Sequence, residues 1–203
     1  ALPLVTAIAK KRFQHKSPTD TPLLSERNQW WAQYEAVSAL AQWPGAKAYG
    51  LVKSKVDEAP QVARVMALYL WKESLPQIVS WVKAGSSGAE KAHEALTAPV
   101  SRAMLRPARE EMLKILLDPK ADRELRHQIA LKLGLCSTDD EIGVLLADYE
   151  IAKDPQTKLM VSAAIFASRS PRAIPLLKKL VHESQDARAR MGALVQLKGM
   201  TTD

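Results

Sequence analysis

The sequence predicts an all-α protein built from antiparallel helix pairs. Apolar residues recur at helical spacing, as at Val62, Val65, Met66 and Tyr69, which places them on one face of a helix. Strand signals are nearly absent, because few stretches alternate apolar and polar residues and no Asn-Gly or Asp-Gly turn occurs. An internal repeat of about 31 residues holds two helices per period. Together these features predict an α-solenoid, a right-handed α-α superhelix of about five helix pairs plus a terminal helix.

The expected helices follow one another with short connections, which implies antiparallel packing of neighbours. Proline, acidic or hydroxyl residues mark many of their starts, where they cap or fit the first turn. The expected pairs are 22–43 with 46–56, 60–72 with 76–84, 89–97 with 107–117, 122–133 with 139–152, and 155–167 with 171–184, followed by 186–198.

Several boundaries are predicted from single residues. The run 138–141, Thr-Asp-Asp-Glu, is a capping box, and Thr21-Pro22 offers an N-cap with proline in the first turn. Gly134 and Gly199 follow helical segments and are expected as C-caps. We expect residues 1–21 to be a basic N-terminal segment or linker, 22–199 the repeat array, and 200–203 a tail. Within the array, 85–117 is expected to be irregular, with a flexible linker at 85–88, because Pro99 and Pro107 interrupt helical hydrogen bonding.

The repeat is clearest from a basic residue near the start of each first helix. Arg126, Lys158 and Arg188 are 32 and 30 residues apart, and Arg64 precedes Arg126 by 62 residues, two periods of 31. A cation that recurs with the period indicates a structural role between neighbouring repeats. Three leucines are expected in repeat cores: Leu133, Leu146 and Leu177.

The repeats resemble a known family. Asp118-Pro119 … Leu125-Arg126 … Ala130 … Leu133-Gly134 resembles the first helix of a HEAT or HEAT-like repeat, and the segment 171–180 resembles the second, including the proline that typically begins it. The resemblance is good over 118–199, fair over 30–84 and poor over 85–117. It implies an α-solenoid that binds other molecules, but it does not select a partner, because such arrays bind very different things.

Motifs of catalysis, cofactor binding and metal binding are missing from the sequence. No HExxH, G-x-S-x-G, P-loop or G-x-G-x-x-G occurs, and the acidic run 139–141 is interpreted as helix capping rather than a metal site. The single Cys136 excludes an internal disulfide, and no apolar run approaches the length of a membrane span. We therefore expect no cofactor, no metal and no membrane span, and a cytoplasmic location is favoured.

The positive charge is concentrated near the N-terminus. Of a net charge of +7, residues 1–55 carry +5, from eight basic and three acidic residues. Trp30 and Trp31 diverge by about 100° on a helix, so that one can enter the core while the other tends towards the surface. The expected partner-binding residues are Lys10, Lys11, Arg12, Lys16, Trp30, Trp31, Lys47, Lys53 and Lys55.

Three functions fit these features. The leading hypothesis is a non-enzymatic protein-binding scaffold or adaptor, part of a larger polypeptide or complex, whose partner presents an acidic surface. The first alternative is a nucleic-acid-binding protein similar to the HEAT-like DNA glycosylases, although the acidic helix expected at 139–152 would repel phosphate. The second is an accessory helical domain of an enzyme.

Overall fold

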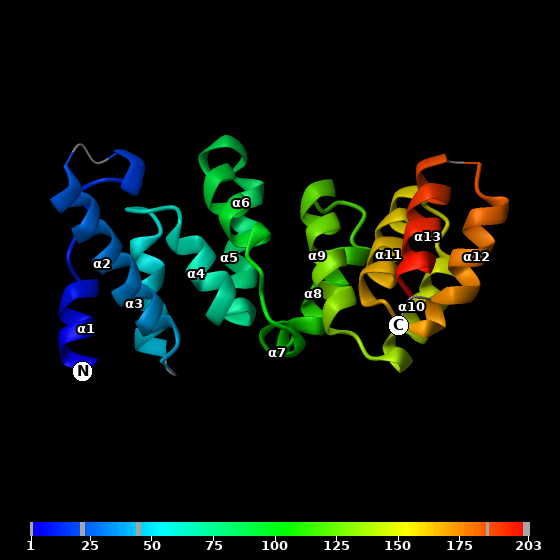
Figure 1. Cartoon of the computed structure of the whole chain (residues 1–203), viewed down its shortest axis with the longest axis horizontal. Coiled ribbons are helices and arrows are strands. Elements are labelled where there is room, and N and C mark those ends of the chain that lie inside the picture. The colour runs from blue at the N-terminus through cyan, green and yellow to red at the C-terminus, as the bar shows by residue number, and fades with distance from the viewer. Residues whose placement is uncertain (1, 21–22, 44–45, 186, 201–203) are drawn as a thin grey trace. The chain divides into compact units, whose positions relative to one another are not determined.

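All regular structure that the computed structural model describes is helical (Figure 1). The described residues are 2–20, 23–43, 46–185 and 187–200. The predicted all-α class is confirmed for them. The chain divides into two compact units, unit 1 with residues 1–104 and unit 2 with residues 105–203.

In unit 1, alternate helices pack on one another. The helices are α1 (Leu2–Ala9), α2 (Leu24–Ala41), α3 (Ala46–Lys55), α4 (Val62–Tyr69), α5 (Trp71–Lys83), α6 (Ala89–Thr97) and, at the boundary between the units, α7 (Arg102–Leu105). Helix α2 packs on α4 and α4 on α6, while α3 contacts α2 and α4, and α5 contacts α4 and α6. Helix α1, which the sequence patterns do not predict, packs against α2.

Unit 2 is likewise built of helices that pack on one another. It contains α8 (Arg109–Leu117), α9 (Arg123–Cys136), α10 (Asp139–Ile151), α11 (Pro155–Ser168), α12 (Ile174–Glu183) and α13 (Ala187–Met200). Helix α9 packs on α8 and on α11, α10 packs on α11, and α12 on α13. The capping box before α10 is confirmed: Thr138 Oγ1 accepts the Glu141 N–H at 3.4 Å, and the Glu141 carboxylate accepts the Thr138 N–H at 2.8 Å.

Two glycines differ from their predicted roles. Gly134 does not end a helix, because α9 continues to Cys136. A Cβ at Gly134 would lie 2.2 Å from the Ala164 carbonyl oxygen, so this glycine permits the close approach of α9 and α11. Gly199 likewise lies inside α13. The segment 85–88, expected to be a flexible linker, contains a 3₁₀ turn at Gly85–Ser87. A Cβ at Gly88 would lie 2.1 Å from the Trp81 carbonyl oxygen.

In the predicted pair 60–72 with 76–84, the start of the second helix at Pro76 is wrong by about one helical turn. Helix α4 ends at Tyr69, Leu70 leaves the helical region at φ −136° and ψ 41°, and α5 begins at Trp71 with Pro76 inside it. Buried Ser74 adds a side-chain link at this junction, since its hydroxyl lies within hydrogen-bond distance of the carbonyls of Leu70 (2.6 Å) and Met66 (3.2 Å). The predicted Thr21-Pro22 cap and the tail residues 201–203 lie outside the described residues.

The predicted core is confirmed at two of its three leucines. Leu133 and Leu177 are fully buried. Leu146 is only partly buried, and its neighbour Leu145 is fully buried instead. Helix α10 therefore turns the face that holds Ile142 and Leu145 inward, and Leu146 lies about 100° around the helix from Leu145.

The recurring cations join helices that are one period apart. Buried Arg126 donates from Nε to the Leu116 carbonyl and from Nη2 to Thr157 Oγ1, both at 2.9 Å. Arg64 Nη1 lies 3.9 Å from Glu94 Oε2, which links α4 to α6. These contacts confirm the predicted structural role for Arg126 and Arg64. The side chain of Arg188 lies outside the described part of the chain.

Candidate partner-binding site

Residues 10–16, termed here the cationic loop, are held in place by an ion pair between buried Lys55 and partly buried Glu58. Lys55, at the end of α3, is 5% exposed, and its Nζ donates to the Lys11 carbonyl at 2.8 Å. The same Nζ lies 3.0 Å from Glu58 Oε1, and Glu58 Oε2 accepts the Phe13 N–H at 2.9 Å. Because α1 ends just before the loop, the Lys55 ammonium also lies close to the C-terminal end of α1.

The opposite side of the cationic loop is fixed by α2. Trp30 Nε1 donates to the His15 carbonyl at 3.0 Å, and Gln33 Nε2 donates to the Arg12 carbonyl at 3.3 Å. Trp30 is 3% exposed and stacks on Tyr34, with ring centroids 5.3 Å apart, while the ring of Phe13 lies 5.4 Å from it. Burial in this aromatic cluster raises the pKa of the Tyr34 phenol. The loop backbone is thus anchored from two directions.

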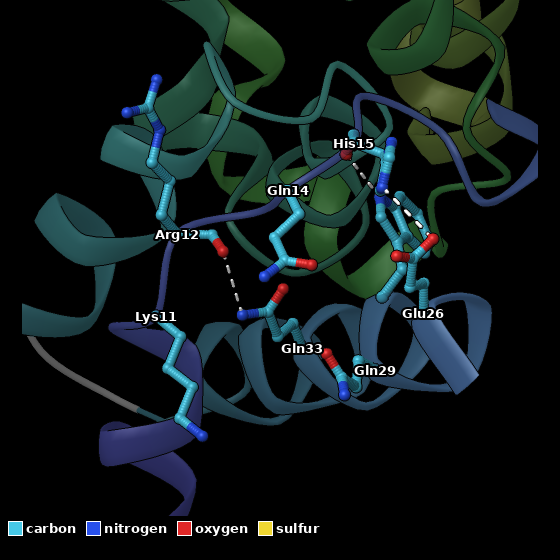
Figure 2. A pocket seen from close by; sticks show the side chains of 8 residues that line it. Lys11, Arg12, Gln14, His15, Glu26, Gln29 and Gln33 are labelled. Atoms are coloured by element: carbon cyan, nitrogen blue, oxygen red, sulfur yellow. Dashed lines mark hydrogen bonds and ion pairs between the residues drawn. The ribbon is translucent and has the colours of Figure 1, made fainter. Parts of the chain in front are cut away.

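A polar pocket of about 220 Å³ lies between the cationic loop and α2 (Figure 2). Figure 2 shows the side-chain amides of Gln14, Gln29 and Gln33 grouped together, with Lys11 and Arg12 beside them and their side chains extended in opposite directions. The lining residues are Lys11, Arg12, Gln14, His15, Glu26, Gln29, Trp30 and Gln33. The pocket is smaller than the roughly 300–1,000 Å³ typical of sites that enclose a small-molecule ligand. Its size suits a part of a larger partner.

The pocket presents both hydrogen-bond donors and acceptors. Each glutamine amide has two N–H donors and one carbonyl acceptor, and Gln33 uses only one donor on the loop. Within the described ranges, the side chains of Gln14 and Gln29 have no protein hydrogen-bond partner. Glu26 adds a carboxylate whose Oε2 lies 3.7 Å from His15 Nε2.

The structure confirms exposure for some of the predicted binding residues. Within the part of the chain that the structure describes, five predicted cations are exposed and have no ion-pair partner: Lys10, Lys11, Arg12, Lys16 and Lys53. Only Lys11 and Arg12 line the pocket. Lys53 lies about 200° around α3 from buried Lys55, on the other face of that helix. The side chain of Lys47 lies outside the described residues.

Two predicted binding residues are corrected by their burial. Lys55 is not a surface cation, because it is buried and saturated by Glu58 and the loop carbonyls. Trp30 is likewise part of the core, which leaves Trp31, at 45% exposed, as the tryptophan on the surface. Since Trp31 lies about 100° around α2 from Trp30, away from Gln29 and Gln33, it does not line the pocket.

The glutamines of the pocket were missed by sequence reasoning, which looked for charge. Gln29 and Gln33 are spaced by one helical turn, and this spacing places both amides on the same face of α2. Gln14 comes from the cationic loop, so no local pattern connects it to them. Its position depends on the fold of the loop over α2.

The acidic run in the first turn of α10 is bonded mainly to arginines rather than exposed to a ligand. Arg106 and Arg109 both pair with Glu141, the latter with Nε 3.1 Å from Oε1, and Arg172 Nη2 lies 2.8 Å from Asp140 Oδ1. Partial burial raises the pKa of Glu141, but hydrogen bonds from Arg106 and Thr138 outweigh this and lower the pKa to about 2. Among the described residues, no group of His, Cys, Asp and Glu side chains could hold a metal ion.

A second, more apolar pocket of about 750 Å³ lies in unit 2 between α9, α11 and α13. Leu159, Met160 and Phe166 of α11 and Gly192 of α13 are among its lining residues. Phe166 occupies the repeat position that Gly134 has in α9, 32 residues earlier. Because a phenylalanine stands where the α9–α11 contact has a glycine, α13 is kept from approaching α11 as closely, and the pocket remains.

Comparison of the chain with protein-family models, with curated proteins and with solved structures finds no match. In the described ranges, no helix combines the length and the apolar character needed to cross a bilayer. The geometry of the cationic loop and its pocket is therefore the basis for the function proposed below.

Proposed function

We propose that the chain is a HEAT-like α-solenoid that acts as a non-enzymatic protein-binding scaffold, and that its cationic loop meets an acidic surface of the partner. The repeat architecture is supported by polar links between residues one period apart. Arg64 and Glu94 are 30 residues apart, and Arg126 and Thr157 are 31. Ser170 donates to Asp139 at 2.6 Å across 31 residues. Links of this separation are expected when each repeat contacts mainly its neighbours.

The observation that carries the binding role is a set of unpaired cations on an anchored backbone. Lys11 and Arg12 have no ion-pair partner within the described residues, yet their carbonyls are held by Lys55 and Gln33. A fixed backbone reduces the entropy that the loop loses when a partner binds. Concentrated positive charge also accelerates encounter with an acidic surface, an effect that salt screens.

A protein partner is favoured over nucleic acid by the chemistry of the pocket. Phosphate oxygens only accept hydrogen bonds, so a phosphate site needs converging donors and cations. Here the side chains of Lys11 and Arg12 extend in opposite directions and do not converge, and Glu26 of α2 adds a negative charge beside His15 (Figure 2). Such a mixture of donors and acceptors suits a protein surface better than a phosphate backbone.

The proposal is tested by reversing the charge of the loop. The Lys11→Glu, Arg12→Glu, Lys16→Glu triple variant and the wild type are immobilised and exposed to nuclease-treated extract of the source organism. The retained proteins are then identified by quantitative mass spectrometry. We expect the variant to lose an acidic protein that the wild type retains, and the wild type to lose it at high salt.

A matched control reverses three exposed cations of unit 2, Lys120, Lys153 and Lys178. This control changes the net charge equally but leaves the loop intact, so it should retain the partner. Equal retention by both triple variants would contradict a role for the loop. Recovery of nucleic acid alone from untreated extract would contradict the protein-binding function and support the nucleic-acid alternative.

A further inference from the structure

We infer that the pocket beside the cationic loop binds an extended acidic segment of the partner, with the glutamine amides bonded to its main chain and Lys11 and Arg12 to its carboxylates. This inference rests on the proposed function and adds the form of the ligand. It assigns the recognition of the main chain to Gln14, Gln29 and Gln33, which charge alone does not identify.

The chemical match begins with the main chain. Every peptide unit offers one N–H donor and one carbonyl acceptor, and both must be bonded when the segment is removed from water. A glutamine amide offers the complementary pair of groups. Gln29 and Gln33 stand one turn apart on α2, and Gln14 faces them from the loop (Figure 2). These amides can therefore bond an extended backbone without distinguishing its side chains.

The side chains of the segment are selected by charge. Figure 2 shows Lys11 and Arg12 beside the amides, with their side chains extended in opposite directions along the loop. In an extended segment, successive side chains also point to opposite sides. Carboxylates that flank the bonded stretch would therefore reach one cation each. A folded acidic surface would instead offer side chains alone and leave the amides in water.

The size of the pocket agrees with a segment rather than a whole ligand. About 220 Å³ accommodates one or a few residues, while the remainder of a peptide can run along the exposed loop. The backbone of the site is already in place, because Trp30 and Lys55 hold the loop on its two sides. Gln14 and Gln29 can form new bonds without breaking protein hydrogen bonds in the described structure.

Fluorescence anisotropy with a synthetic peptide tests the inference directly. The probe is a short fluorescein-labelled peptide of alternating Glu and Ala residues, compared with the same peptide methylated on its backbone nitrogens. The variant is Gln14→Ala with Gln29→Ala, and the matched control is Gln42→Ala at the exposed end of α2. We expect the double variant to bind the unmethylated peptide about tenfold more weakly, as the loss of two modest hydrogen bonds implies.

Backbone methylation should weaken binding to the wild type to a similar extent and cause little further loss in the double variant, because both changes remove the same bonds. Gln42→Ala should bind as the wild type does. Undiminished binding by the double variant, or equal affinity for both peptides, would overturn the inference. So would failure of the wild type to bind the peptide at all.

The outcomes for the inference and for the proposed function are separable. If Lys11→Glu with Arg12→Glu abolishes peptide binding while the double glutamine variant and methylation have no effect, the acidic partner stands and main-chain recognition falls. If the peptide fails to bind but the loop reversal still releases an acidic protein from extract, the partner presents a folded surface. Tighter binding of a single-stranded oligonucleotide than of the peptide would overturn both.

Discussion

The cationic loop of unit 1 and the arginine cluster at the start of α10 in unit 2 use similar side chains in opposite ways. In unit 2, Arg106 and Arg109 pair with Glu141, and Arg172 pairs with Asp140. In the described part of the loop, Lys11 and Arg12 have no acidic partner, and only their backbone is held. The difference shows that the charge available for binding depends on whether a carboxylate lies one period away, not on the count of cations.

The two regions also differ in how their anchors are built. The acidic residues that neutralise the unit 2 arginines lie on the first turn of a helix, where they also cap free N–H groups. The loop is anchored by the buried pair Lys55–Glu58 and by Trp30, so its exposed cations contribute nothing to the anchoring. In unit 1, anchoring and binding are therefore assigned to different residues, whereas the arginine cluster of unit 2 is assigned a structural role alone.

The largest effect should come from removing a buried arginine that is hydrogen-bonded within the fold. Arg126→Ala removes two hydrogen bonds from a buried charged group and leaves a cavity between α8, α9 and α11. We expect it to lower the free energy of unfolding by about 3–5 kcal/mol, measured by urea denaturation. Its counterpart Arg12→Ala, an exposed and unpaired arginine, should change the stability by no more than about 0.5 kcal/mol. Similar losses of stability in both variants would refute the distinction between arginines that are bonded within the fold and arginines that are free at the surface.

Sequence patterns predicted the all-α class better than they predicted which of the cations are exposed. Helical periodicity and the recurrence of Arg64 and Arg126 are local or periodic signals, and the structure confirms the helices and the structural role of both arginines. Burial of Lys55 could not be predicted in this way, because its partners include the loop carbonyls of Lys10 and Lys11, more than 40 residues earlier.

The pocket illustrates the same limit of local patterns. Gln29 and Gln33 share a helix face by their spacing, but Gln14 joins them only because Trp30 and Lys55 fold the loop back over α2.

The burial of Leu145 in the core, in place of the expected Leu146, has a related cause. Adjacent leucines fit the same periodic pattern, and packing of α10 against α11 decides which of them is buried.

A smaller loss of stability is expected from replacing the buried lysine that anchors the cationic loop. Lys55→Met should lower the free energy of unfolding by about 1–3 kcal/mol, because Glu58 loses its charged partner and the carbonyls at the end of α1 lose their donor. Lys53→Met, on the exposed face of the same helix, should change it by less than about 0.5 kcal/mol. Thermal unfolding followed by circular dichroism measures both. If the two variants melt alike, Lys55 does not anchor the loop.

The smallest effect concerns Glu141 and depends on pH. Because the pKa of Glu141 is lowered to about 2 in the folded chain from an ordinary value of 4.5, the unfolded chain binds its proton first as the pH falls. The stabilisation is therefore complete above pH 4.5 and is lost as the pH falls from 4.5 towards 2. Allowing for solvent screening, Glu141→Gln should lower the free energy of unfolding by about 1–2 kcal/mol at neutral pH.

The difference between Glu141→Gln and the wild type should shrink steadily as the pH falls below 4.5. Urea denaturation at a series of pH values measures it. The matched control, Glu111→Gln, removes an exposed carboxylate of α8 that has no ion-pair partner in the described structure, and it should follow the wild type at every pH. A Glu141→Gln deficit that stays constant from neutral pH down to pH 3 would mean that the lost stability comes from packing or capping. The arginine cluster of unit 2 would then resemble the cationic loop, with charges that do not contribute to stability.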